Sequence, residues 1–403
     1  MRVACVSVLL AAGFAGSGFC GHAQTGNATL PATAAARQAP VPTAPAPNTA
    51  APDENLAAAI PVVQLDFKPQ PAIPGVAASP IFASPVLCSS DGIPFVDYPQ
   101  APDFMEQIVY SLDPKGARAF SSKSVPDLYD VHFQSFFVGD SVVGLLVRAT
   151  KDEKHSTTTY NPLPGFSAKP VPYYPGEHHD YLVEFDRDGN YKSTVELPTA
   201  YHFWRIGALS DGSLLALGYD RANSVARLLL LDSGGQIVRP IEAPSLTQDS
   251  PELRQGESGP EINRARAESS LSWWLFVPSR NRILLYQAHS ATPLLEVGAG
   301  GALREVPLEA PKGYVLDGVV PANDRWIVRY RRQSLSNNGE IDARPETKNY
   351  LLYEVDPANG SLKRQIDPGT GPLFNIACEQ DGVMTAFSMD NDKVMRAIAE
   401  IPR

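Results

Sequence analysis

The stretch LVEFDRDGNYKSTVEL, residues 182–197, contains two short segments in which apolar and polar residues alternate, joined by an Asp-Arg-Asp-Gly turn. Alternation on both sides of an Asp-Gly turn is a strong short-range signal for a β-hairpin. A single hairpin does not define the fold of a chain of 403 residues. What matters is whether the hairpin is repeated.

Hairpins of two kinds recur along the chain. The first kind, like 182–197, has an apolar-rich strand, a turn of Asp, Gly, Pro or Asn, and a second strand; its other copies are 108–120, 226–241, 293–308 and 350–366. The second kind precedes each of these and occurs once more at the end, giving 88–98, 136–149, 208–220, 276–288, 319–331 and 378–389. The turns of the second kind recur at intervals averaging about 58 residues, and a four-strand unit repeated on this scale is typical of a β-propeller.

The number of strands predicts how the ring closes. After 378–389 the chain supplies one more strand, 394–401, so the sixth unit lacks its outer strand. One spare strand-like segment, 62–67, stands before the first repeat. We predict an all-β fold over residues 60–403: a six-bladed β-propeller of four-stranded antiparallel blades, in which the N-terminal strand 62–67 fills the empty place. Seven blades, or a sandwich of the same strands, are the alternatives, although a sandwich needs neither the missing strand nor the spare one.

The blade pattern over about residues 61–403 resembles the six-bladed propeller proteins of the NHL-repeat and TolB-like type, exported bacterial members included. This resemblance rests on the pattern alone and on no family-specific motif. It implies binding of proteins, glycans or small ligands and, in some members, a lactonase or other hydrolase activity that uses a metal in the central channel. Because neither outcome follows from the fold, function has to be inferred from a site.

The N-terminal residues predict export. Residues 1–23 carry a single charge before an apolar run and end in small residues, which is the pattern of a secretory signal peptide. A lipid anchor on Cys20 is the rival interpretation, although Phe19 beside it fits such a site badly. Residues 24–59 are rich in Ala and Pro and predict a disordered leader or, alternatively, a spacer. We expect a periplasmic or extracellular monomer with no membrane span.

The net charge excludes some classes of partner, and the positions of the cysteines predict a disulfide. The formal net charge is −10 and no block of Lys or Arg interrupts it, so nucleic acid and anionic membranes are not expected partners. Cys5 and Cys20 leave with the signal peptide. Cys88 and Cys378 each stand three residues before an Asp-Gly turn, at equivalent inner-strand positions of the first and last blades. We therefore predict a disulfide between them; the alternative is two buried thiols too far apart to bond.

The connections predict one working face. In an up-and-down blade, the turns within the hairpins fall on one face and the remaining connections on the other. The longest connections, 151–179, 245–268 and 332–348, all belong to the second set. Chance lengthening of surface loops is the alternative, although it explains their length more easily than their position on one face. Inner strands begin on that face, so their first residues can point into the mouth of the channel. We predict that ligand is bound there by His132, Tyr201, His202, Trp204, Arg205, Trp273 and Asp317. Packing between blades is the alternative for these aromatic side chains and for the adjacent Trp274.

Histidines near the same face raise the question of a metal. His178 and His179, with His132 and His202, could supply imidazole ligands for zinc. Adjacent residues of an extended chain point to opposite sides, so only one of His178 and His179 can face a given ion. Solvent-facing loop histidines are the alternative. The DRDGN sequence at 186–190 is explained as a turn.

The sequence contains no HExxH motif, no Gly-x-Ser-x-Gly elbow and no Gly-rich phosphate loop. We predict a binding propeller without catalytic residues, metal or cofactor, whose partner is a protein or a carbohydrate. The alternative is a hydrolase or lactonase that uses a divalent metal at the mouth of the channel.

Overall fold

A computed structural model describes the residue ranges 60–74, 83–99, 107–160, 169–248, 271–279, 281–288, 290, 293–322, 325–333, 350–368, 375–390 and 393–402. All of them belong to the unit Leu56–Arg403. The predicted signal peptide 1–23 and leader 24–59 lie outside the described residues, as do most of the predicted insertions 245–268 and 332–348.

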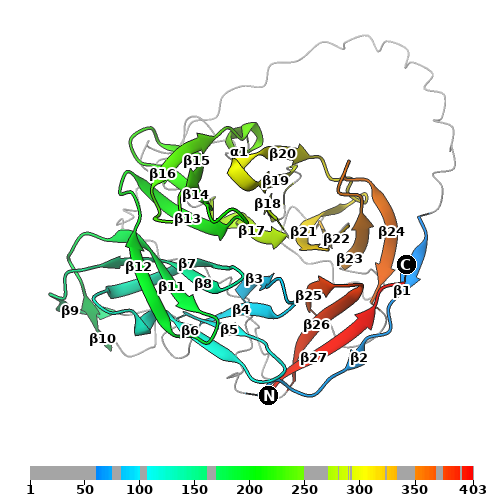
Figure 1. The fold of residues 1–403 in the computed structure, drawn as a ribbon, viewed down its shortest axis with the longest axis horizontal. Helices are drawn as coiled ribbons and strands as arrows, with labels where there is room; N and C mark the ends of the chain where they lie inside the picture. The colour runs from blue at the N-terminus through cyan, green and yellow to red at the C-terminus, as the bar shows by residue number, and fades with distance from the viewer. Residues whose placement is uncertain are drawn as a thin grey trace, which may run out of the picture. The chain divides into compact units, whose positions relative to one another are not determined.

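Six blades are arranged around a ring, each with four antiparallel strands (Figure 1). In five blades these strands pair in the order in which they occur along the chain, whereas blade six takes its outer strand from the N-terminal segment. The first three blades are β3 (Ala83–Cys88), β4 (Pro94–Pro99), β5 (Gln107–Ser111), β6 (Arg118–Ser121); β7 (Tyr129–Val138), β8 (Val142–Thr150), β11 (His179–Asp186), β12 (Tyr191–Glu196); and β13 (Tyr201–Ala208), β14 (Leu214–Asp220), β15 (Val225–Leu231), β16 (Ile237–Ile241). The last three are β17 (Trp274–Ser279), β18 (Arg282–Gln287), β19 (Leu294–Gly298), β20 (Leu303–Val306); β21 (Tyr314–Pro321), β22 (Trp326–Arg332), β23 (Tyr350–Val355), β24 (Leu362–Asp367); and β25 (Asn375–Gln380), β26 (Val383–Asp390), β27 (Lys393–Glu400), β2 (Lys68–Pro69). The predicted six-bladed propeller is therefore confirmed.

The hairpin 182–197 shows how one blade is made. The carboxylate of Asp186 accepts hydrogen bonds from the backbone N–H groups of Asp188 and Asn190, both at 2.9 Å, and Gly189 takes a φ of 91°. This left-handed conformation costs glycine little and closes the turn between β11 and β12.

The apolar core lies between blades, in six clusters that each join two neighbours. Successive side chains of one strand enter different clusters: Tyr181 and Val183 of β11 face the first blade, whereas Leu182 faces the third. Because both faces of an internal blade are covered, the strands are more continuously apolar than in a sheet with one wet face.

The ring is closed by N-terminal residues, as predicted, but by a different segment from the one expected. The outer strand beside β27 is β2, and the following Ile73 N–H donates to the Val394 carbonyl at 3.0 Å. The predicted strand 62–67 lies on the neighbouring blade, where β1 (Val62–Gln64) pairs in parallel with β24 (Figure 1). Leu65, which lies between β1 and β2 in the chain, is buried in the apolar cluster that joins blades five and six. The N-terminal segment therefore spans two blades.

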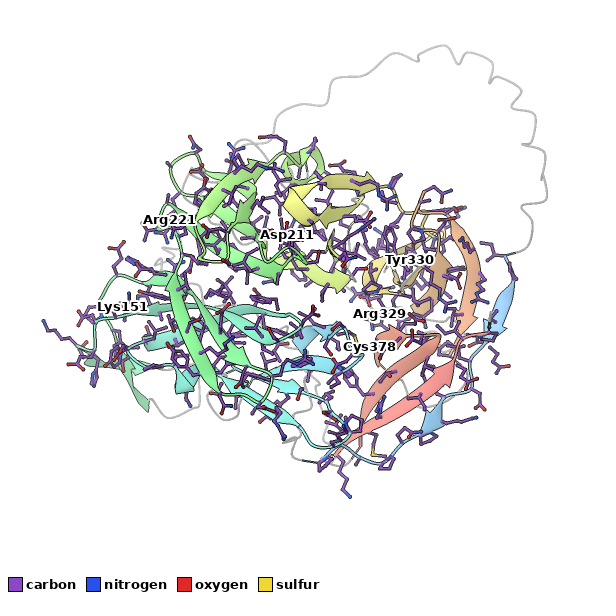
Figure 2. All side chains as sticks on the ribbon, in the orientation of Figure 1. Lys151, Asp211, Arg221, Arg329, Tyr330 and Cys378 are labelled. Carbon is purple, nitrogen blue, oxygen red and sulfur yellow. A yellow bond between two sulfur atoms is a disulfide. The ribbon has the colours of Figure 1, made fainter. Side chains whose placement is uncertain are left out.

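Cys88 of β3 and Cys378 of β25 form a disulfide, with their Cα atoms 5.8 Å apart (Cys378 is marked in Figure 2). The bond joins the inner strands of the first and last blades across 290 residues of sequence. Blade six is thus attached on one side by a covalent bond and on the other by the N-terminal segment.

We define the long-loop face as the face of the ring that carries the connections between blades and the connections between the second and third strands of each blade. These connections include the hairpin of β9 (Ser156–Tyr160) and β10 (Lys169–Tyr173), the short helix α1 (Pro244–Gln248) and the 3-10 turn Leu271–Trp273. The β9–β10 hairpin occupies the predicted insertion of blade two.

Within the described ranges, none of the helices has both the length and the apolar character that crossing a bilayer requires.

Candidate functional site

Arg205, midway along inner strand β13, is a partly buried cation. Its guanidinium donates to four backbone carbonyls, those of Ser272 at 2.5 Å, Trp274 at 2.7 Å, Trp204 at 2.8 Å and Gln134 at 3.1 Å. These carbonyls belong to blades two, three and four, so one side chain ties three inner strands together. Burial lowers the pKa of Arg205 to about 10, which keeps it protonated at neutral pH.

Asp97 of β4 is the buried acid that interacts electrostatically with Arg205. It is 7 % exposed, and burial raises its pKa to about 7, against the opposing effects of a backbone hydrogen bond and the Arg205 charge. Its Oδ1 atom has no hydrogen-bond partner within the part of the chain that the structure describes. The sequence prediction did not include Asp97; a carboxylate inside the apolar strand FVDY was the available signal.

Trp273 and Trp274 have opposite environments. Trp274 is 3 % exposed and packs in the core between blades three and four, whereas Trp273 is 54 % exposed. The Arg205 guanidinium binds the carbonyls on both sides of Trp273, namely those of Ser272 and Trp274. Trp273 is therefore a large aromatic side chain exposed to solvent, and the backbone on both sides of it is held by hydrogen bonds to Arg205.

The other aromatic candidates lie nearer the core. Tyr201 packs against the cluster between blades two and three, and Trp204 against the one between blades three and four. The His202 ring lies 4.9 Å from that of Trp204. The Phe203 backbone N–H donates at 2.8 Å to Asp180, a carboxyl whose pKa is raised by burial.

Asp317 accepts a hydrogen bond of 2.5 Å from Nε of Arg329, which stands on β22 (Figure 2). The same guanidinium lies over the Tyr350 ring at 5.6 Å, and Tyr350 is 45 % exposed at the start of β23. Asp317 thus orients an arginine that supports a second exposed aromatic side chain on the long-loop face. Neither Tyr350 nor Arg329 was among the predicted site residues.

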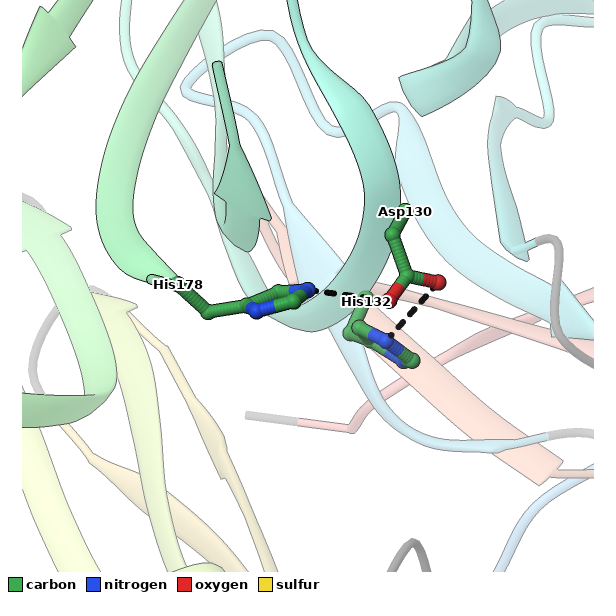
Figure 3. A group of neighbouring side chains, drawn as sticks. All are labelled: Asp130, His132 and His178. Carbon is green, nitrogen blue, oxygen red and sulfur yellow. Dashed lines mark hydrogen bonds and ion pairs between the residues drawn. The ribbon is translucent and has the colours of Figure 1, made fainter. Parts of the chain in front are cut away.

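His132 comes together with His178 and with Asp130, which the sequence analysis did not single out (Figure 3). Nε2 of His178 lies 2.9 Å from one Asp130 carboxylate oxygen, and Nε2 of His132 lies 3.3 Å from the other. His179 binds Glu196 instead, at 2.6 Å. The two adjacent histidines therefore have different partners, as expected for an extended segment.

At the opposite end of the inner strands, where the tight turns lie, the residues around a small hollow are apolar. The residues that line this hollow include Leu87, Val138, Ile206 and Phe276. Asp97, the exposed rings of Trp273 and Tyr350, and the histidine cluster lie toward the long-loop face, so that face holds the candidate site.

Comparison with known proteins gives no family. No family model matches the chain, and no curated protein matches it. Among solved structures, similar chains include the β-propeller domain of the Trilobed protease from Pyrococcus furiosus, at 10 % identity and a TM-score of 0.38, with 79 % of this chain and 84 % of that chain covered. A GH74 xyloglucanase from Xanthomonas campestris is similar at 13 % identity and a TM-score of 0.40, covering 83 % of this chain and 46 % of that one.

A protein of unknown function from Bacteroides caccae is similar at 10 % identity and a TM-score of 0.34, with 72 % of this chain and 81 % of that chain covered. At these TM-scores the similarities support no inference about activity, and the assignment of six blades rests on the strand pairing itself.

Proposed function

We propose that this chain is an exported, non-catalytic propeller that binds a protein or carbohydrate partner through its long-loop face. The observation that carries the proposal is Trp273, an aromatic side chain 54 % exposed, whose flanking backbone carbonyls accept hydrogen bonds from the partly buried Arg205. A large aromatic group on a rigid support contributes contact area at a low cost in conformational entropy, and such groups dominate many binding sites.

Tyr350 supports the same face. It is 45 % exposed and lies beneath the guanidinium of Arg329, which Asp317 orients. Aromatic rings accompanied by a fixed charge suit stacking against a sugar ring or a side chain of a protein partner. The acidic net charge of −10 disfavours nucleic acid.

The test compares two exposed aromatic residues on opposite faces. Trp273→Ala removes the proposed contact, and Tyr191→Ala, at the tight-turn end of β12 and 39 % exposed, is the matched control. Both variants and the wild type are applied to a glycan array and to affinity capture from envelope extracts. We expect Trp273→Ala to weaken binding at least tenfold, by about 1.4 kcal/mol or more, with Tyr191→Ala unchanged. Equal binding by all three chains contradicts the proposal.

The second candidate function is a metal-dependent hydrolase or lactonase at the channel mouth. The observation that favours it is the grouping of Asp130 with His132 and His178, two residues along β7 from the Gln134 carbonyl that Arg205 binds. Hydrolysis of ester and lactone panels with added Zn²⁺, lost in His178→Ala, would establish this function in place of simple binding.

A further inference from the structure

We propose that Asp130, His132 and His178 form a binding site for a divalent transition-metal ion, which we represent by Zn²⁺. The ligand atoms are one carboxylate oxygen and two imidazole nitrogens, all within 4.8 Å of one another. This inference stands independently of the proposed partner-binding function, because it concerns only what these three side chains hold.

The backbone brings the three residues together from two strands. Asp130 and His132 stand on β7, and His178 directly precedes β11 (Figure 3). The register between β7 and β8 shifts between Tyr129 and His132, and Asp130 takes a φ of 49°, which is left-handed. Bulges of this kind redirect side chains and are common beside functional sites. Here the bulge places the carboxylate between the two imidazole rings.

Both ring nitrogens of His178 face oxygen acceptors. Its Nδ1 lies 2.9 Å from the Gly176 carbonyl oxygen, and its Nε2 lies 2.9 Å from the Asp130 carboxylate. Both neighbours are acceptors, whereas a neutral imidazole has only one N–H to donate. With Nδ1–H donated to the Gly176 carbonyl, the Nε2 lone pair faces the Asp130 carboxylate, and a metal ion bound between them would satisfy both groups.

The same arrangement is the one that metal sites use to orient a ligating histidine, with the distal ring N–H held by a carbonyl oxygen. Gly176 suits this role because a Cβ there would come within 2.6 Å of Thr150 Oγ1 and 2.8 Å of Asp152 Cβ. A larger residue would displace the segment that carries the carbonyl.

The distances between the three side chains and the charge of Asp130 are also compatible with a zinc site. In tetrahedral zinc sites, bonds of about 2.0–2.2 Å place ligand atoms roughly 3.3–3.5 Å apart. The two nitrogen–oxygen distances of 2.9 and 3.3 Å lie close to that spacing. In the part of the chain that the structure describes, the ion-pair partners of Asp130 are these two imidazoles, and no Lys or Arg side chain pairs with it. No permanently charged side chain therefore competes with a metal for this carboxylate.

The chemistry of the donors selects the ion. Two imidazoles and one carboxylate suit zinc and neighbouring transition metals, whereas Ca²⁺ and Mg²⁺ prefer all-oxygen sites. The side chains are 21–29 % exposed, so an ion can enter from solvent. Three protein ligands leave a fourth position for water or for a donor atom of a bound partner.

The experiment measures Zn²⁺ binding to the purified full chain after removal of metal with a chelator. Equilibrium dialysis with elemental analysis gives the stoichiometry, competition with a chromophoric chelator gives the affinity, and the visible spectrum of the Co²⁺ form reports the ligands. The variants are His132→Ala and His178→Ala. The controls are His179→Ala, adjacent in sequence but bonded to Glu196, and His155→Ala, which is exposed.

We expect one equivalent of Zn²⁺ in the wild type, an affinity at least about 100-fold lower in each of the two variants, and changes within about threefold in the controls. If His178→Ala fails to fold, Asp130→Asn, which keeps the shape but loses the charge, takes its place with the same expectation. The proposal is overturned if the wild type binds no Zn²⁺, if these variants bind as the wild type does, or if Ca²⁺ competes equally.

Discussion

At the scale of single residues, two ionisable groups stand out: Arg205, which is partly buried, and Asp97, which is buried. The guanidinium has a planar set of N–H donors that reaches carbonyls of three blades. A lysine at the same place would carry the charge but could reach fewer acceptors, so some of the buried carbonyls would lose their partners. The identity of the residue as arginine therefore matters more than its charge.

We predict that Arg205→Lys lowers the free energy of unfolding by about 3 kcal/mol, since several buried hydrogen bonds to a charged donor are lost. Urea denaturation followed by tryptophan fluorescence measures this. Arg118→Lys, at an exposed position on β6, is the matched control and should lie within about 0.5 kcal/mol of the wild type. A loss of equal size in both variants would show that the carbonyl contacts of Arg205 have no special importance.

Asp97 makes stability depend on pH. Burial raises its pKa from the ordinary 3.8 to about 7, so between these values the folded state holds a proton that the unfolded state has lost. Stability therefore falls as pH rises through this window and is fully reduced above the folded pKa. Relative to Asp97→Asn, the wild type should lose about 4 kcal/mol between pH 4 and pH 8, at about 1.4 kcal/mol per pH unit.

Chemical denaturation at several pH values checks this expectation, because other titrating groups contribute equally to both chains and cancel. A difference between wild type and Asp97→Asn that stays constant from pH 4 to pH 8 would falsify the role assigned to Asp97.

The candidate site was only partly predictable from residue patterns. The alternation of an extended chain correctly separates His178 from His179. Asp130 escaped notice because a β-bulge breaks that alternation, and bulges leave no clear trace in a pattern of apolar and polar residues. Trp273 and Trp274 are adjacent and chemically identical, so only the structure distinguishes the exposed ring from the buried one.

At the scale of elements, the N-terminal segment 60–74 is the part whose pairing the sequence predicted least well. Hairpins are recognised by local turn chemistry, and every predicted hairpin corresponds to two paired strands. The segment 60–74 has no turn connecting it to a partner, so alternation alone could not decide between the open edge of β24 and that of β27. The structure uses both edges, with a parallel pair on the first and an antiparallel pair on the second.

We predict that deletion of residues 1–74 destabilises the propeller and promotes self-association, whereas deletion of residues 1–59 leaves the melting temperature within about 2 °C. The larger deletion exposes the edge of β27 and removes Leu65 and Ile73, each worth about 1.5–3 kcal/mol of burial. Calorimetry and light scattering measure the two effects. Identical melting curves for the two deletions would mean that the segment 60–74 does not close the ring.

At the scale of the whole molecule, stability is distributed around the ring. Each of the six apolar clusters joins two blades, so a blade is held by both neighbours and by no single central core. At the junction of blades one and six, the chain passes from β2, the outer strand of blade six, to β3, the inner strand of blade one. The disulfide between Cys88 and Cys378 lies at this junction.

We predict that the double variant Cys88→Ser, Cys378→Ser loses about 3–5 kcal/mol of stability, because the unfolded chain gains the freedom of a very long loop. Denaturation of wild type with and without reductant should reproduce the loss, and the double variant should not respond to reductant. A reductant effect of the same size in the variant would place the sensitivity elsewhere.

Synthesis order gives the cysteine pair a second consequence. Cys88 is made 290 residues before Cys378, and these are the only cysteines in the part of the chain that the structure describes. Cys88 therefore cannot form its disulfide until almost the entire propeller has been synthesised. Its partner within the described residues is then Cys378. Among the described residues, a chain that stops early keeps Cys88 as a thiol open to alkylation, whereas a completed chain offers neither Cys88 nor Cys378. In a protein expressed without Cys5 and Cys20, labelling with a maleimide dye thus distinguishes finished molecules from truncated ones without any assay of binding.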